Sequence, residues 1–242
     1  MQPIQTFVIS LKDSVGRQEQ AARELAKTKL QWSFIEAVDG RDLDLQNSPY
    51  SPRKVKRLLG FELTPKEIGC YLSHMKAWQA CVEANTVTLI FEDDFIIGEN
   101  FEEIIKTFLS SRLSWDILRL QALFESHDIL IREFNGFRWV CNTSDPLGAT
   151  AYMINPNSAK KLISQSTEIF EPLDHYLEHM EKHGLIMSAI KPYPITVTDP
   201  TRATSTITDR PDRLPIRGLR KKIRSIARLF DRYCSSNPYF PK

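Results

Sequence analysis

The chain has 242 residues, of which 42% are hydrophobic and 26% are charged, and its formal net charge is +2. This composition excludes a disordered chain and a fibrous repeat, and the length is sufficient for one sizeable α/β core. Cys70, Cys81, Cys141 and Cys234 form no CxxC pair, which argues against a disulfide framework or a zinc knuckle and favours a reducing cytoplasm. No signal peptide and no membrane span is expected from the apolar runs.

The first half of the chain predicts strands alternating with helices. Thr64, Pro65 and Glu67 form a capping box with proline at the first helical position, so a helix is predicted from there to about Ala84. Hydrophobic periodicity predicts the other elements in this half. They are strands at 4–11, 32–38 and 86–93, and a helix at 17–29.

The second half continues this alternation. Asn100, with Glu103 three residues on, is expected to start a helix, and Asn135-Gly136 is the strongest hairpin signal in the chain. The remaining predicted elements are strands at 115–120, 127–134, 137–142 and 148–154, and helices at 157–165 and 172–183. Together these patterns predict an α/β fold with a mainly parallel, Rossmann-type sheet and a late antiparallel hairpin. No linker is expected before about Asp199.

Three adjacent carboxylates, Glu92, Asp93 and Asp94, follow the apolar run VTLIF. Side chains alternate along a strand, so Glu92 and Asp94 are expected to point one way and Asp93 the other. The carboxyl end of a parallel strand is where α/β sheets bind ligands, and a divalent cation with a diphosphate would remove the repulsion among these acids. The alternative is a solvated turn that binds nothing.

Five segments together resemble glycosyltransferase family 25, the bacterial lipopolysaccharide and lipooligosaccharide glycosyltransferases. They are FVISLKDSVGRQEQ, FIEAVDG, LTPKEIGCYLSHMKAW, LIFEDDF and GATAYMI, in that order. The resemblance covers roughly residues 5–205 and implies a GT-A fold. It also implies a nucleotide-sugar donor, usually UDP-galactose, and inverting transfer that forms a β-linkage on a growing glycan.

The resemblance also suggests roles for individual residues. Asp94 would be the main ligand of Mn²⁺ or Mg²⁺, and Glu92 would support the metal or the donor ribose. The metal-binding set would be completed by Asp199, since no histidine is found in the segment where many metal-dependent GT-A enzymes supply a further ligand. The expected donor-binding residues are Ser10, Arg17, Ala37, Val38, Asp39, Ser73, His74, Glu92 and Asp93. For Ser73 and His74, contact with the ligand and support of the site from behind remain alternatives.

Inverting transfer needs a base that takes the proton from the acceptor hydroxyl. The candidate is Asp174, at the start of a predicted helix, although an acid in a first helical turn is also favoured by the helix dipole alone. His175, His179 and His183 are spaced by four on the same helix, where a surface face is favoured over a zinc site. The tryptophans are expected in the core, with Trp139 or Phe137 as possible stacking partners for an acceptor sugar.

The C-terminal residues are basic, with nine Lys/Arg against two acids from Arg210 to Arg232. An apolar stripe repeats at helical spacing through Leu219, Ile223, Ile226 and Phe230. We therefore divide the chain into a GT-A-like catalytic domain (1–209) and a basic amphipathic tail (210–242). The tail is expected to lie on an anionic inner-membrane surface from the cytoplasmic side, close to a lipid-linked acceptor, with docking on the catalytic domain as the alternative.

Three functions compete. The first is a metal-dependent glycosyltransferase that uses a UDP-sugar donor and a saccharide or lipid-linked glycan acceptor. The second is a metal-dependent phosphohydrolase or nucleotidyltransferase, which also uses acids at a strand end. The third is a non-catalytic protein that binds membranes or nucleic acid through its tail; nucleic acid is not expected as a partner, because basic charge alone is weak evidence for it.

Overall fold

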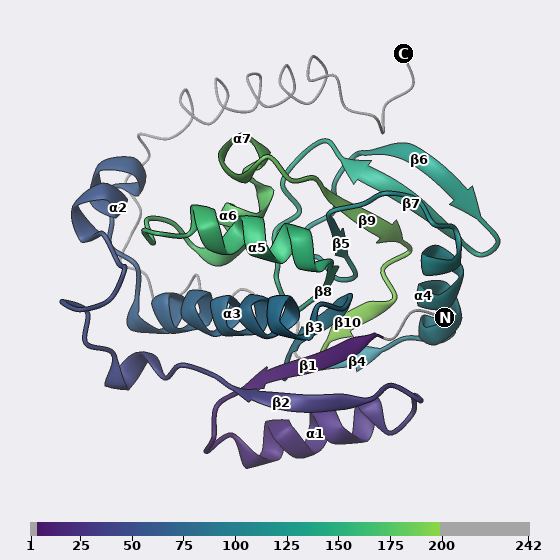
Figure 1. Ribbon diagram of the computed structural model, residues 1–242, viewed down its shortest axis with the longest axis horizontal. Coiled ribbons are helices and arrows are strands. Elements are labelled where there is room, and N and C mark those ends of the chain that lie inside the picture. The colour runs from purple at the N-terminus through teal and green to yellow at the C-terminus, as the bar shows by residue number, and fades with distance from the viewer. Residues whose placement is uncertain (1–3, 199–242) are drawn as a thin grey trace.

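Eight strands form one mixed sheet in the computed structural model, which describes residues 4–198 (Figure 1). Their order across the sheet is β2-β1-β3-β8-β5-β9-β7-β6, and β4 and β10 form a separate pair. The strands are β1 (Gln5–Ser10), β2 (Trp32–Glu36), β3 (Thr88–Glu92), β4 (Phe95–Ile97), β5 (Ile117–Arg119), β6 (Asp128–Phe134), β7 (Phe137–Asn142), β8 (Ala151–Ile154), β9 (Met187–Lys191) and β10 (Ile195–Val197).

The sheet is mainly parallel in direction. The pairings β1–β2, β1–β3 and β5–β9 are parallel, and the pairings around β8 and β7 are antiparallel. Only β8 and β7 therefore run against the other six strands of this sheet. The predicted mixed, mainly parallel α/β fold is confirmed.

Helices cover both faces of the sheet (Figure 1). They are α1 (Val15–Leu25), the 3-10 helix η1 (Gly40–Asp42), α2 (Pro52–Leu59), α3 (Pro65–Ala84), α4 (Phe101–Ser110), α5 (Pro156–Gln165), α6 (Leu173–Glu178) and α7 (Met180–His183). One core layer contains buried side chains of α3, α5 and α6, and the other contains those of α1 and α4. Each large apolar side chain buried in these layers contributes about 1.5–3 kcal/mol, which offsets the entropy lost on ordering the chain.

Local sequence signals located most of these elements correctly. Thr64 and Glu67 form the predicted reciprocal capping box at the start of α3. The predicted hairpin joins β6 to β7 through Asn135 and Gly136, and Gly136 has φ +86°, a conformation that glycine adopts without steric cost. Asn100 precedes α4, but it has φ +59° and its side chain makes no cap hydrogen bond.

Three sequence predictions need correction. The helix predicted over 172–183 is divided into α6 and α7, because His179 leaves the helical region with ψ 71°. Strand β9 was not predicted, although it lies between β5 and β7. Trp139 and Phe137 are buried in the core, with 2% and 4% exposure, so neither is available to stack on a sugar.

The predicted tail, residues 210–242, lies outside the described residues, as does the boundary proposed at residue 209. Among residues 4–198, no helix is both long and apolar enough to cross a membrane.

Candidate functional site

The acidic residues lie at the carboxyl-terminal edge of the parallel strands β1 and β3. Ile9 is paired with Glu92 across these strands, so Ser10 at the end of β1 lies beside Asp93. Asp93 and Asp94 form the turn that leads from β3 into β4. The cluster is therefore at the sheet edge where α/β folds bind ligands, as expected.

Arg17 partly neutralises the cluster. Its Nη2 lies 2.5 Å from Asp93 Oδ1 and 3.0 Å from Asp94 Oδ2, and the Ser10 hydroxyl donates to Asp93 Oδ2 at 2.6 Å. Asp93 and Asp94 thus share one guanidinium and do not point to opposite faces as strand alternation predicted. The physical reason is that both residues belong to a turn, where the two-residue period no longer applies.

Glu92 faces α3 and the segment before β8. Its Oε1 accepts from Cys70 Sγ at 3.4 Å and lies 3.4 Å from His74 Nε2, and its Oε2 accepts from the Thr150 hydroxyl at 3.1 Å. Burial by itself would raise the pKa of Glu92, but the contacts with His74, Cys70 and Thr150 hold this pKa below its ordinary value. Glu92 therefore remains a carboxylate at neutral pH.

Asp94 carries the negative charge that the protein compensates least. Its Oδ1 is buried and has no hydrogen-bond partner among the described residues. Burial and the negative charge of Glu92 outweigh the attraction of Arg17 and raise the pKa of Asp94 to about 6. An unpartnered carboxylate oxygen in a negative field fits a hard divalent cation, so the donor set suits the Mn²⁺ or Mg²⁺ expected from the sequence.

The other predicted metal ligand, Asp199, lies outside the described residues. The last described residue, Thr198, donates its backbone N–H to the Asp94 carbonyl at 2.8 Å.

Two predicted donor-binding residues, Ser73 and His74, are buried with 1% and 0% exposure. Ser73 donates to the Gly69 carbonyl at 2.6 Å and accepts from the Val38 N–H at 2.8 Å. His74 Nδ1 lies 2.8 Å from the Tyr152 hydroxyl, and its other ring nitrogen faces Glu92. Their polar atoms contact protein groups, so this structure favours support of the site over direct ligand contact.

The predicted segment Ala37, Val38 and Asp39 follows β2 in the chain. In space it contacts the end of β1 and the first half of α3. The Ala37 N–H donates to the Ser10 carbonyl at 2.9 Å, and Asp39 is ion-paired with Arg41. A Cβ on Gly69 would lie 2.6 Å from the Val38 carbonyl oxygen, so a glycine is required for this close approach. The structure thus brings Ser10, Arg17 and residues 37–39 to the same edge as the carboxylates.

Asp174 lies on α6, whose buried side chains share a core layer with those of α3. Burial raises the pKa of the Cys70 thiol well above its ordinary value, and the charges of Glu92, Asp174 and Asp94 raise it further. These three acids are therefore all within electrostatic reach of one side chain. Asp174 Oδ1 accepts from the His175 N–H at 2.9 Å. The candidate base Asp174 and the candidate metal ligand Asp94 thus both act on the Cys70 thiol, although they are 80 residues apart in the sequence.

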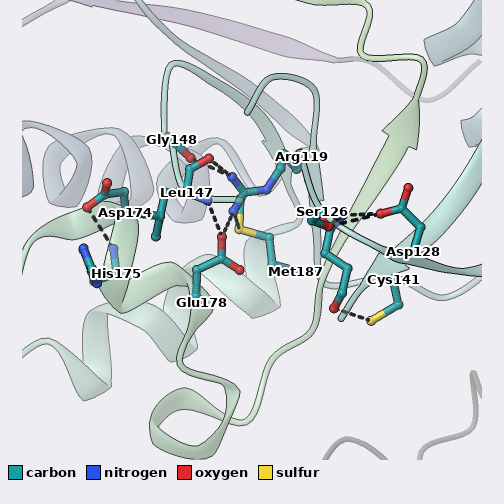
Figure 2. Close-up of polar contacts among 11 residues, drawn as sticks. Arg119, Ser126, Asp128, Cys141, Leu147, Gly148, Asp174, His175, Glu178 and Met187 are labelled. Atoms are coloured by element: carbon teal, nitrogen blue, oxygen red, sulfur yellow. Dashed lines mark hydrogen bonds and ion pairs between the residues drawn. The ribbon is translucent and has the colours of Figure 1, made fainter. Parts of the chain in front are cut away.

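A buried ion pair holds α6 in place, and sequence reasoning did not find it. Figure 2 shows Glu178, on the helix that carries Asp174, facing Arg119 of β5. Arg119 also donates to the carbonyls of Leu147 and Gly148. Arg119 has 0% exposure and Glu178 has 3% exposure. The only signal in the sequence was an arginine between two leucines at the end of the predicted strand WDILRL.

The histidines on α6 and α7 do not form the surface face that was favoured from the sequence. His179 and His183 have 5% and 1% exposure, and His179 Nδ1 lies 2.8 Å from Glu171 Oε2. Burial lowers the pKa of His183 to about 4, so it is neutral at physiological pH. Within residues 4–198, these histidines belong to no group of three metal-ligating side chains.

A family model places these observations among known proteins. The model of Glycosyltransferase family 25 (LPS biosynthesis protein) matches residues 3–177. Procollagen galactosyltransferase 1-A of Xenopus laevis is 28% identical over 195 residues, covering 75% of this chain and 32% of that protein. Lipooligosaccharide biosynthesis protein lic2B of Haemophilus influenzae is 26% identical, covering 64% of this chain and 61% of that protein.

The relatives also include a protein named as inactive. Inactive glycosyltransferase 25 family member 3 of Homo sapiens is 31% identical over 192 residues, covering 73% of this chain and 31% of that protein. The chain thus spans about a third of the length of its animal relatives. Among solved structures, A197 from STIV aligns with a TM-score of 0.44 at 10% identity, covering 77% of this chain and 81% of that one.

Proposed function

Because the chain belongs to glycosyltransferase family 25, we propose that it transfers a hexose from a UDP-sugar to a glycan acceptor. The donor proposed is UDP-galactose, and the transfer inverts the anomeric carbon to form a β-linkage on a lipooligosaccharide or lipopolysaccharide chain. The relatives named as a procollagen galactosyltransferase and a lipooligosaccharide biosynthesis protein support this choice of sugar and acceptor. The observation that carries the proposal is the cluster of Glu92, Asp93 and Asp94 at the carboxyl-terminal edge of β1 and β3, within the matched residues.

The donor's diphosphate is proposed to bind at the acidic turn. Asp94 is the main protein ligand of Mn²⁺ or Mg²⁺, which, when bound, supplies positive charge that stabilises the leaving diphosphate. The side chain of Arg17 is 45% exposed and lies at the acids, so its guanidinium is accessible from solvent beside them. Its guanidinium suits bidentate phosphate binding. Ser10 and residues 37–39 hold the nucleoside end of the donor.

Asp174 is proposed as the general base. Its carboxylate takes the proton of the acceptor hydroxyl while the hydroxyl oxygen forms a bond to the anomeric carbon. The bond from that carbon to the diphosphate oxygen breaks, and UDP leaves with the electron pair. A positioned base of this kind contributes about 10²–10⁴-fold to the rate.

A UDP-release assay tests the proposal. Purified full-length protein is given Mn²⁺ and a panel of UDP-sugars, with and without lactose-, GlcNAc- and glucose-terminated acceptors. We expect acceptor-stimulated release from one UDP-sugar, lost in Asp94→Asn and lowered at least about 100-fold in Asp174→Asn. Glu133→Gln, an exposed acid on β6, is the matched control and retains activity.

The assay also separates the competing functions. Release that is equally fast without any acceptor identifies a hydrolase and contradicts the transferase proposal. No release from any donor, combined with no protection of the protein by UDP-sugars against heat unfolding, contradicts nucleotide-sugar binding altogether. Retained UDP-sugar protection in Asp174→Asn is expected, because the base acts after the donor has bound.

A further inference from the structure

A second set of metal-ligating side chains lies beside Asp94 and contains sulfur and nitrogen as well as oxygen. Cys70 and His74 are one helical turn apart on α3, and Glu92 ends β3. Cys70, His74 and Glu92 each offer one ligand atom, and these three atoms lie within 4.8 Å of one another. Within residues 4–198, this is the one group of three or more such side chains with this geometry.

Two of the three separations among these ligand atoms match those around a tetrahedral zinc ion. Zinc bonds of about 2.3 Å to sulfur and about 2.0–2.2 Å to nitrogen or oxygen put neighbouring ligand atoms about 3.3–3.6 Å apart. Glu92 Oε1 lies 3.4 Å from Cys70 Sγ and 3.4 Å from His74 Nε2. The ligand atoms of Cys70 and His74 lie within 4.8 Å of each other, so zinc binding requires at most a modest adjustment of this third separation.

Supporting contacts orient these ligands as in known metal centres. His74 Nδ1 lies 2.8 Å from the Tyr152 hydroxyl, which also accepts from Trp78 Nε1 at 2.8 Å. When a metal ion replaces the proton on Nε2, the ring proton on Nδ1 would be donated to that hydroxyl, and the lone pair of Nε2 would be directed at the ion. Thr150 holds the other oxygen of Glu92. Asp94 and Asp174 add negative charge, which favours a cation here.

We propose that Cys70 Sγ, His74 Nε2 and Glu92 Oε1 bind one Zn²⁺ ion, whose fourth position is taken by water. Cys70 gives up its thiol proton to solvent when the metal–sulfur bond forms. This site shares Glu92 with the proposed Mn²⁺ or Mg²⁺ site but differs from it in donor atoms, because that site has only carboxylate oxygens from the described residues. A thiolate and an imidazole select zinc over those harder cations.

Zinc at this site is expected to inhibit the enzyme, because it draws Glu92 away from the acidic turn. This consequence rests on the proposed transferase function, whereas binding of zinc does not. The primary test is therefore a binding measurement that needs no substrate.

The test uses Co²⁺ as a spectroscopic probe of the untagged, metal-stripped full-length protein, reduced with a phosphine. We expect one equivalent of Co²⁺ to give a thiolate-to-metal charge-transfer band in the near ultraviolet, and Zn²⁺ to abolish it. The band is expected to disappear in Cys70→Ser, and affinity to fall at least about tenfold in His74→Gln and Glu92→Gln. Cys81→Ser, a buried cysteine elsewhere on α3, is the control and keeps the band.

Absence of the band in the wild-type protein overturns the proposal, and so does a band that persists in Cys70→Ser. Circular dichroism and thermal unfolding of each variant establish that it is folded. If Cys70→Ser does not fold, Glu92→Gln provides the test, because glutamine keeps the shape of the glutamate side chain. An unchanged affinity of Glu92→Gln for Co²⁺ overturns the proposed site. Asp94→Asn is expected to bind Co²⁺ with the same band, which separates this site from the carboxylate site of the proposed function.

Discussion

At the scale of single residues, the site is organised around charge that the protein leaves partly uncompensated. Asp93 has two partners, Ser10 and Arg17, whereas Asp94 has one oxygen paired with Arg17 and one buried oxygen without a partner among the described residues. Burying a charge without full pairing costs free energy unless a ligand supplies the missing charge. The adjacent acids Glu92, Asp93 and Asp94 therefore destabilise the ligand-free fold, and a bound cation would remove this destabilisation.

This cost gives a prediction for Asp94→Asn in the presence of a chelator. The pKa of Asp94, raised from 3.8 to about 6, means that the folded state favours its protonated form. Its stabilising contribution is fully present below about pH 3.8 and is lost as the pH rises through about 6. Removing the charge should therefore raise the free energy of unfolding by about 1–3 kcal/mol at pH 7.

Urea unfolding at pH 3.5 and pH 7 measures this difference. We expect the wild type and Asp94→Asn to have similar free energies of unfolding at pH 3.5. At pH 7 we expect Asp94→Asn to be the more stable of the two. A variant less stable than the wild type at pH 7 would mean that the Arg17 ion pair outweighs the repulsion from Glu92. The same variant is expected to lose transferase activity, so stability and function would change in opposite directions.

At the scale of elements, a short helix holds the candidate base. Helix α6 has six residues, fewer than an isolated helix needs to be stable in water. Asp174 and Glu178 are four residues apart and so lie on the same side of this helix. Glu178 is anchored to Arg119, which also binds the carbonyls of the loop leading to Thr150. One guanidinium thus links the helix of Asp174 to the loop that leads to a partner of Glu92.

We therefore expect Glu178→Gln to disturb activity as well as stability. Loss of one charge leaves Arg119 buried without its counterion, and breaking such a pair costs about 3–5 kcal/mol. The turnover number should fall more than the affinity for donor, because Asp174 shifts while Ser10 and Arg17 do not. Urea unfolding and steady-state kinetics measure the two effects.

Glu168→Gln is the matched control for this prediction. It breaks an ion pair with Lys54 in which both side chains are at least one-third exposed. Exposed pairs contribute about 0–1 kcal/mol, so this variant should remain close to the wild type in both measurements. Equal effects of the two substitutions would show that Arg119 does not position α6.

At the scale of the whole molecule, the proposed division at residue 209 separates catalysis from membrane attachment. The described part of the chain carries the carboxylates and the candidate base. The basic tail, with its apolar stripe, is predicted from sequence alone. Each tail cation near an anionic bilayer contributes about 1 kcal/mol to binding.

Deletion of residues 210–242 tests this division. The truncated protein should no longer sediment with vesicles that contain anionic lipid, yet should keep activity on a soluble saccharide acceptor. The full-length protein with vesicles of neutral lipid is the control and should bind weakly, since the electrostatic attraction is absent. Loss of activity on the soluble acceptor would favour the alternative, in which the tail docks on the catalytic domain.

Features that depend on neighbouring residues could be predicted from the amino-acid sequence. The capping box of Thr64 and Glu67, the Asn135-Gly136 hairpin and the apolar run before Glu92 act over a few residues, and the predicted α/β fold follows from their alternation. The carboxylates could be assigned to a strand end for the same reason.

Contacts between groups that are distant in the sequence became visible in the folded structure. Strand β9 enters the sheet between β5 and β7 because it packs against both, and no local signal specifies that partner. Arg119 and Glu178 become an ion pair, and Cys70 joins Glu92, through contacts between residues 59 and 22 positions apart. Burial and charge at such contacts depend on the whole fold, which is why the roles of His74, Trp139 and Arg119 followed from packing and not from sequence pattern.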